Sequence, residues 1–173
     1  MVNMRVSDQV APGSLEEVRV LLNTWLIPND TRSAEDRLED YARERGLASP
    51  DRAALRRVRD DLRDAVEGIA DADDVLNRWI DRLGVQPRVA RGELTFRHDG
   101  GLAGRLVAAC VAAVAAGRWR RLKACPDCRW VFYDHTRNAG KRWCVMTASG
   151  PAGRSCGSIA KVRAYRERAR KRP

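Results

Sequence analysis

Residues 125–144 read CPDCRWVFYDHTRNAGKRWC and contain three of the five cysteines of this 173-residue chain. Two residues separate Cys125 from Cys128, fifteen lie between Cys128 and Cys144, and eleven lie between Cys144 and Cys156. Two thiolates at the first spacing converge from one tight turn, and four thiolates make the soft tetrahedral ligand set that zinc prefers. The spacing therefore predicts a zinc ion held by Cys125, Cys128, Cys144 and Cys156.

This ligand set has two alternatives. His135 lies between Cys128 and Cys144 and is a reserve ligand in place of one cysteine. Four thiolates also hold iron–sulfur clusters, although the two-residue spacing favours zinc. Because four thiolates leave the metal no open position, we expect the zinc to be structural rather than catalytic.

Charge changes sharply along the chain, just before the cysteines. Residues 1–116 contain 17 Lys/Arg and 20 Asp/Glu, whereas residues 117–173 contain 16 Lys/Arg and 3 Asp/Glu. A break of this kind predicts two modules, 1–116 and 117–173, with different partners. A small, strongly basic module is attracted to polyanions, of which nucleic acid is the commonest in a cytosolic chain.

After Cys156 the sequence IAKVRAYRERARKR predicts a basic helix. At about 100° per residue, Ile159, Val162, Tyr165 and Ala169 share one narrow stripe, and cationic residues occupy most of the rest. Such a helix fits the major groove, where arginine forks match guanine edges and phosphates. The candidate nucleic-acid contacts are Arg129, Arg137, Asn138, Lys141, Arg142, Arg154, Lys161, Arg163, Arg166, Arg168 and Arg170.

The fold class expected from these patterns is α+β. Apolar residues at helical spacing predict helices at 15–26, after Ser33, from Ser49 to about residue 69, at 72–83 and at 102–116. Ser14 and Glu17 stand in the relation of a capping box before the first helix. Two short segments, 85–91 and 93–97, predict a β-hairpin. A helix-rich N-terminal domain with a small hairpin is thus followed by a small four-cysteine zinc module that ends in a basic helix.

Residues 121–168, RLKACPDCRWVFYDHTRNAGKRWCVM followed by CGSIAKVRAYRER, resemble the CGNR-type zinc finger. In that bacterial family the finger follows an N-terminal domain known as ABATE, proposed to act in stress-induced transcription regulators. The early LLNTW helix, the helix-rich middle and the hairpin make residues 1–116 similar to that domain. The resemblance implies the four cysteines as zinc ligands and DNA as the partner. This chain has Ser158-Ile159 where the pattern has Asn-Arg, and a longer loop before Cys156.

The leading hypothesis is a bacterial DNA-binding transcription regulator. Its zinc module would position the basic helix on double-stranded DNA, and residues 1–116 would act as a sensor or dimerisation unit, with a small-molecule effector or a second copy as partner. Residues 1–116 contain no nucleophile motif, phosphate loop or paired histidine ligands, so no enzymatic activity is expected. The longest apolar run, 106–116, is too short to cross a bilayer, and no apolar leader is present. We therefore expect no membrane partner and a cytoplasmic, nucleoid-associated location.

Two other functions remain open from the sequence. Aromatic residues interleave with arginine in the module, a pattern that suits RNA or ribosome binding by base stacking. These residues are Trp119, Trp130, Phe132, Tyr133 and Trp143. A thiolate-based redox or zinc sensor, in which oxidation releases the metal, is the other alternative.

Overall fold

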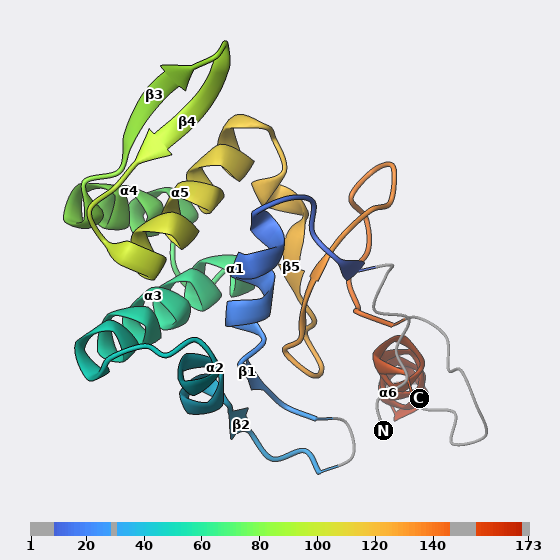
Figure 1. The fold of residues 1–173 in the computed structure, drawn as a ribbon. Coiled ribbons are helices and arrows are strands. Elements are labelled where there is room, and N and C mark those ends of the chain that lie inside the picture. The colour runs from blue at the N-terminus through green and yellow to red at the C-terminus, as the bar shows by residue number, and fades with distance from the viewer. Residues whose placement is uncertain (1–8, 29–30, 146–154, 171–173) are drawn as a thin grey trace.

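The computed structural model describes residues 9–28, 31–145 and 155–170. In this part of the chain, six α-helices and three antiparallel strand pairs make an α+β fold, as predicted (Figure 1). The helices are α1 (Leu15–Leu22), α2 (Leu38–Glu44), α3 (Ser49–Glu67), α4 (Ala72–Leu83), α5 (Gly101–Ala115) and α6 (Cys156–Arg170). The strands are β1 (Trp25–Leu26), β2 (Glu35–Asp36), β3 (Gln86–Ala90), β4 (Glu93–Arg97), β5 (Leu122–Ala124) and β6 (Val131–Tyr133).

Helices α3 and α4 begin and end where local chemistry places them. Pro50 lies in the first turn of α3, and Gly68 ends the helix in the left-handed region at φ 71°. The side chain of Asp71 accepts hydrogen bonds from the backbone N–H groups of Asp73 and Asp74 and so caps α4. Glycine adopts the left-handed backbone conformation after a helix more easily than other residues, and Gly84 ends α4 in the same way. Both helices match their predicted ranges closely.

The first helix is shorter than its apolar pattern predicts. Helix α1 ends at Leu22, and Trp25 and Leu26 instead form β1, which pairs with β2. The Thr24 hydroxyl donates to the carbonyl of Leu21 at 2.8 Å, which closes the turn after the helix. The side chain of Ser14 makes no capping hydrogen bond, so the predicted capping box does not form. Glu17 binds Arg105 of α5 instead.

Helix α5 runs through the main core, which is the larger of two groups of buried apolar side chains. Leu106, Val107 and Cys110 are fully buried on it, and α5 contacts α1, α3 and α4. Burial raises the pKa of the Cys110 thiol well above its ordinary value. Cys110 is therefore a core residue rather than a reactive thiol.

Strands β5 and β6 were not predicted from the sequence, and they continue the main core beyond residue 116. Because side chains alternate along a strand, Val131 and Tyr133 pack in the main core while Phe132 packs with the cysteines. Leu122 of β5 also belongs to the main core. The charge break at residue 116 therefore does not coincide with an edge of the core. Independent folding of residues 1–116 and 117–173 stays a prediction.

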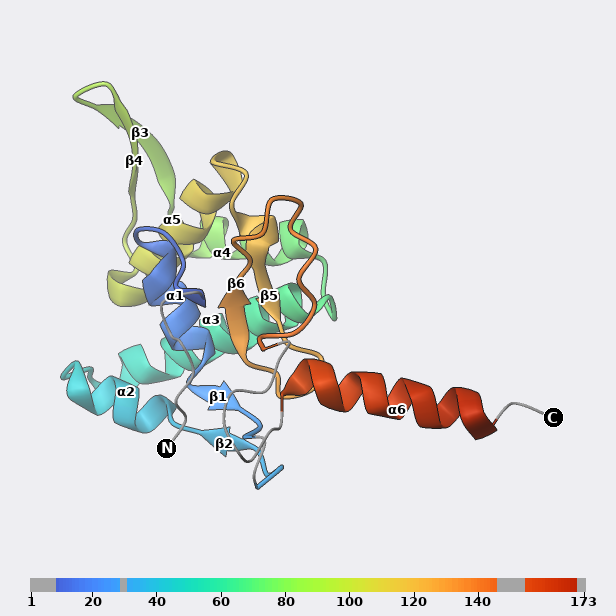
Figure 2. The ribbon, with the colours of Figure 1, turned by 90° about the vertical axis from the view of Figure 1, so that its right-hand side faces the viewer.

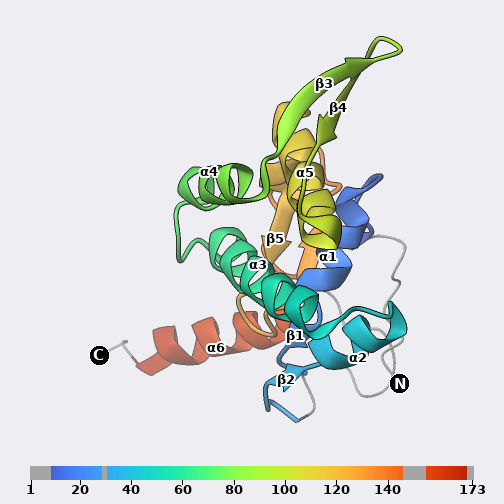
Figure 3. The same cartoon turned by 60° about the vertical axis from the view of Figure 1, so that its left-hand side comes forward.

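Two elements project from the body at opposite ends. The β3–β4 hairpin extends away from α5, and α6 extends in another direction (Figures 2 and 3). Among the described residues, no helix is both long and apolar enough to cross a membrane.

Candidate metal centre

The first two cysteines lie in a tight turn between β5 and β6, here called the knuckle (residues 125–130). The N–H of Cys125 donates to the carbonyl of Trp130 at 2.9 Å, and the N–H of Arg129 donates to the carbonyl of Cys125 at 2.9 Å. Arg129 is in the left-handed region at φ 60°, which lets the chain reverse after Cys128. The two strands thus hold both thiols on the same side of the turn.

The four sulfurs of Cys125, Cys128, Cys144 and Cys156 lie within 4.8 Å of one another. The Sγ atoms of Cys128 and Cys144 are 3.5 Å apart, and those of Cys144 and Cys156 are 3.7 Å apart. A zinc ion about 2.3 Å from each of four thiolates separates the sulfurs by about 3.8 Å, whereas a disulfide bond is about 2.05 Å long. The cluster therefore has the dimensions of a tetrahedral zinc site, and its cysteines are not disulfide-bonded.

All four cysteines are buried, with 0–7% of their surface exposed, around the buried side chain of Phe132. The neighbouring thiols of Cys125, Cys128 and Cys156, together with burial, raise the pKa of the Cys144 thiol. A bound cation reverses this effect, because it favours the thiolate form of its ligands. The donor set fits zinc, which would neutralise the thiolates and hold together segments that share few other apolar contacts.

Cys156 enters the cluster from the first residue of α6. Ser155 and Ser158 cap this helix start reciprocally: the Ser158 N–H donates to the Ser155 hydroxyl, and the Ser155 N–H donates to the Ser158 hydroxyl, both at 3.1 Å. Ser158 stands where the CGNR pattern has asparagine, and in this chain it completes a helix cap. The zinc ligand and the cap together define where α6 begins.

Asp134, which sequence analysis missed, organises the loop that follows β6. Its fully buried carboxylate accepts hydrogen bonds from the N–H and hydroxyl of Thr136, from the N–H of Lys141 and from the ammonium of Lys123. Burial alone would raise the pKa of Asp134, but these donors outweigh it and hold the pKa well below its ordinary value. An aspartate two residues before a threonine is a local signal for such a turn.

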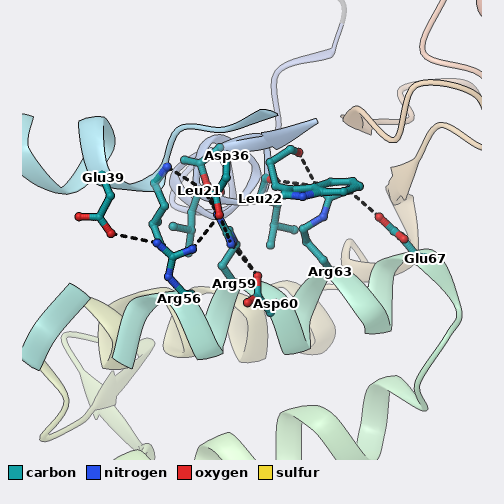
Figure 4. Close-up of polar contacts among 12 residues, drawn as sticks. Leu21, Leu22, Asp36, Glu39, Arg56, Arg59, Asp60, Arg63 and Glu67 are labelled. Atoms are coloured by element: carbon teal, nitrogen blue, oxygen red, sulfur yellow. Dashed lines mark hydrogen bonds and ion pairs between the residues drawn. The ribbon is translucent and has the colours of Figure 1, made fainter. Parts of the chain in front are cut away.

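Helix α3 holds the knuckle through two charged side chains, Arg63 and Glu67, whose places on the helix Figure 4 shows. The guanidinium of Arg63 donates to the carbonyl of Arg129 at 3.0 Å and to Glu67 at 2.5 Å, and Glu67 also pairs with the Arg129 guanidinium. Arg63 further donates to the carbonyls of Leu22 and Trp25. Arg63 falls on the same face of α3 as Leu55 and Leu62, so its position in the helical repeat is the signal that could have identified it.

The side-chain amides of Asn23 and Gln9, in the N-terminal part of the chain, also bind the zinc module. The Asn23 side chain accepts from the N–H of Val131 at 2.7 Å and donates to its carbonyl at 2.8 Å. Gln9 is buried, donates to the carbonyl of Cys144 at 2.9 Å and accepts from the indole N–H of Trp130 at 2.9 Å. No pattern in the sequence distinguishes these amides, because their partners, three backbone groups and the indole of Trp130, are more than a hundred residues away.

The predicted nucleic-acid contacts fall into three groups. Arg129 is paired with Glu67 at the knuckle. The loop after β6 carries Arg137, Asn138, Lys141 and Arg142; of these, the Lys141 ammonium lies over the Phe132 ring and the Arg142 guanidinium over the Trp143 ring. On α6, Lys161, Arg163, Arg166, Arg168 and Arg170 are all exposed. Arg154 lies outside the described residues.

His135 is not part of the cysteine cluster, and the aromatic residues of the module are not fully exposed for base stacking. His135 is outside the four-sulfur cluster; its Nε2 atom is 2.8 Å from the carbonyl of Val10, and its ring packs edge-on against Tyr133. Phe132 and Tyr133 are buried, and the other three aromatic residues of the module are partly buried against the two cores. These three are Trp119, Trp130 and Trp143.

Residues 121–169 match the family model of the CGNR zinc finger. The matched range contains all four cysteines of the cluster. A search of curated proteins finds no match to the chain. The C-terminal part is therefore similar to CGNR zinc fingers, and helices α1 to α5 lie outside the matched range.

Proposed function

We propose that this chain, with a CGNR-type zinc finger at residues 121–169, is a cytoplasmic DNA-binding transcription regulator. In this proposal the zinc ion has a structural role, α6 binds double-stranded DNA, and no step is enzymatic. The main support for this proposal is the projecting basic helix α6, whose first residue, Cys156, is one of the zinc ligands.

Helix α6 has the exposure that a DNA-binding helix needs. Every residue from 161 to 170 is exposed, and Figure 2 draws the helix extending away from the body. Its arginine and lysine residues are exposed and occupy most of the helix circumference, which suits contacts with phosphates on both walls of a groove. Even the apolar stripe is uncovered, with Val162 48% and Tyr165 70% exposed.

The base of α6 is held at the metal centre. Cys156 is one ligand, and the Arg163 guanidinium is 3.3 Å from the Asp127 carboxylate in the knuckle. Arg32 binds the same carboxylate. Zinc would thus set the direction of the helix relative to the knuckle, and loss of zinc would lower DNA affinity without removing a single positive charge.

The RNA-binding alternative receives less support from the site. Stacking on bases needs exposed aromatic faces, whereas two of the module's five aromatic residues outside α6 are buried and three are partly buried against the two cores. The sensor alternative needs accessible thiolates, whereas the four cysteines are buried. The resemblance of residues 1–116 to the ABATE domain supports a sensory or dimerisation role there, and a part in stress-induced regulation.

The test is binding of the zinc-loaded chain to a random duplex DNA pool across a range of salt concentrations. A regulator selects a sequence, and the logarithm of its affinity falls with the logarithm of salt by about 0.9 for each neutralised phosphate. Replacing Arg166 and Arg170 with glutamine should reduce that slope by about 2. Weak binding that is equal for DNA, RNA and heparin would contradict the proposal.

A matched control separates the helix from net charge. Arg57 on α3 and Arg82 on α4 also carry one positive charge each, but they lie on N-terminal helices. The Arg57→Gln/Arg82→Gln variant should bind DNA like the wild type. An equal loss in both double variants would show that only total charge matters.

A further inference from the structure

We propose that the free edge of β4 pairs with β4 of a second copy of this chain, which makes a four-stranded antiparallel sheet across a two-fold axis. The inference concerns the β3–β4 hairpin alone and is independent of the proposed DNA-binding function. It names the surface through which the chain would dimerise.

The hairpin is unusually exposed for an element with an apolar face. Pro87, Val89, Leu94 and Phe96 lie on one face, because Pro87 is opposite Phe96 and Val89 is opposite Leu94. Phe96, at the base, packs against the main core, whereas Val89 and Leu94 are 79% and 55% exposed. A two-stranded hairpin standing alone is marginal in water and gains stability from further strands.

The hairpin's turn determines which backbone groups face outward. Arg91 and Gly92 both have positive φ, 52° and 78°, as in a two-residue type I′ turn. In such a hairpin the pair beside the turn and every second pair exchange hydrogen bonds across the hairpin. These pairs are Ala90 with Glu93, Arg88 with Thr95 and Gln86 with Arg97. The N–H and C=O groups of Leu94 and Phe96 therefore point outward from β4.

The outer edge of β4 is complementary to itself. When two β4 strands run antiparallel about a two-fold axis at Thr95, Leu94 lies opposite Phe96 of the second copy, and their outward N–H and C=O groups meet. Glu93 then lies opposite Arg97 of the second copy, on the other face of the sheet. Neither Glu93 nor Arg97 forms an ion pair within the part of the chain that the structure describes.

The outer edge of β3 lacks this complementarity. Its outward-facing residues are Val89 and Pro87, and Pro87 has no N–H to donate. Antiparallel self-pairing centred on Arg88 would also place two guanidinium groups opposite each other. Proline and charge are the features that natural edge strands use against association, and β4 contains no proline. The two edges of the hairpin therefore differ, and β4 is the one that accepts a second copy.

Self-pairing also covers exposed apolar surface. Leu94 of each copy comes beside Phe96 at the base of the other, where Phe96 already packs against its own main core. Such an interface uses the same residues on both copies, as two-fold symmetry requires.

Sedimentation equilibrium of the full zinc-loaded chain, without DNA, tests the proposal. The expected mass is twice the 19.4 kDa of one chain. Leu94→Pro removes an outward N–H but none of the hairpin's internal hydrogen bonds, so it should halve the measured mass. Val89→Pro makes the same change on the β3 edge and should leave the dimer mass unchanged.

Charge variants test the register without depending on how proline is tolerated. Glu93→Arg and Arg97→Glu should each halve the mass, because each places like charges opposite one another. An equimolar mixture of these two variants should recover the dimer mass, since arginine at 93 then faces glutamate at 97 in the other chain.

Three results would overturn the proposal. The first is a wild-type chain that stays monomeric at the highest soluble concentration. The second is a dimer that dissociates in Val89→Pro but not in Leu94→Pro. The third is a mixture of the two charge variants that stays monomeric although each variant alone has the wild-type circular dichroism. A monomeric chain whose DNA affinity falls in Leu94→Pro would instead assign the hairpin to nucleic acid.

Discussion

Single charged residues add to the apolar contacts of Leu122, Val131 and Tyr133 in connecting the N-terminal helices to the zinc module. Arg59 and Arg63 are buried on α3, and each binds backbone or side-chain groups of segments distant in the sequence. The Glu67 carboxylate forms ion pairs with two guanidinium groups, that of Arg63 on α3 and that of Arg129 in the knuckle. A buried charge without its partner is costly, so the pairs of Glu67 with Arg63 and Arg129 constrain how α3 and the knuckle meet.

Asp36 should make the stability of the chain depend on acid pH. The side chain of Arg59, the main cause, holds the pKa of Asp36 at about 2 against an ordinary value of 3.8. Since the folded-state pKa is lowered, this contribution is present above about pH 4 and is lost as the pH falls toward 2. Asp36 is partly exposed, so we expect Asp36→Asn to cost about 2 kcal/mol or less at neutral pH.

Urea unfolding of both proteins across this pH range measures the effect of Asp36. The cysteine thiolates protonate in wild type and variant alike, so the difference between the two isolates the carboxylate. That difference should shrink as the pH falls from about 4 and should be mostly lost by pH 2, where about half of the Asp36 carboxyl groups are protonated. A difference that stays constant down to pH 2 would show that the Asp36 carboxylate is not stabilised by Arg59.

Asp134→Asn should destabilise the chain by about 3 kcal/mol. The amide would turn an NH₂ group toward donors that now bind the buried carboxylate, and the Lys123 ammonium would lose its only ion pair among the described residues. Chemical denaturation measures the change. Asp40→Asn is the control, because Asp40 forms an exposed ion pair with Arg43 on α2 and should change stability by less than about 0.5 kcal/mol. Equal effects of the two substitutions would refute the structural role of Asp134.

At the scale of elements, β6 and α6 do most to determine the form of the zinc module. Two side chains of β6 pack in the main core and one packs in the smaller core, so this short strand contributes to both. Helix α6 makes few apolar contacts beyond its first turn, because its residues from 161 onward are exposed. Its stability must therefore come from its start, where Ser155, Ser158 and the zinc ligand Cys156 lie.

Ser155→Ala should weaken α6 by about 1 kcal/mol, because it leaves the backbone N–H of Ser158 in the first turn without its cap. Hydrogen exchange of the α6 amides measures this, and their protection should fall about fivefold. Ser14→Ala, before α1, is a matched control, since Ser14 makes no capping hydrogen bond. Unchanged exchange in Ser155→Ala would show that the metal ligand alone maintains the helix start.

At the scale of the whole molecule, two cores are joined by polar contacts and by one strand. The main core contains side chains from α1 to α5 and from β5 and β6. The smaller core consists of four cysteines and Phe132, with three partly buried side chains around it. So small a group buries little apolar surface and depends on the metal for its order.

Removing zinc with a chelator should affect the two cores unequally. Hydrogen exchange should show lost protection in the knuckle, at residues 142–145 and in α6, and retained protection in α1, α3 and α5. Cys128→Ser should reproduce this pattern, whereas Cys110→Ser should keep one zinc ion per chain, because Cys110 lies in the main core. Loss of protection in α3 and α5 on chelation would show that the two cores unfold as one unit.

The local chemistry of the sequence determined most elements of this protein and its metal site. The apolar repeats of α3, α4 and α5, the hairpin and the cysteine spacing each depend on residues that are close in the chain. Pro50, Gly68, Asp71 and Gly84 at the ends of α3 and α4 likewise act on neighbouring backbone groups.

Only the tertiary structure decided how these parts meet. The contacts of Gln9, Asn23 and Arg63 with the zinc module arise where segments distant in the sequence pack together. A buried polar group must find a partner, and in a folded chain that partner is chosen by proximity in space. The change in charge along the chain predicted a boundary at residue 116. Apolar burial depends on contact rather than on charge, and the main core continues across that boundary.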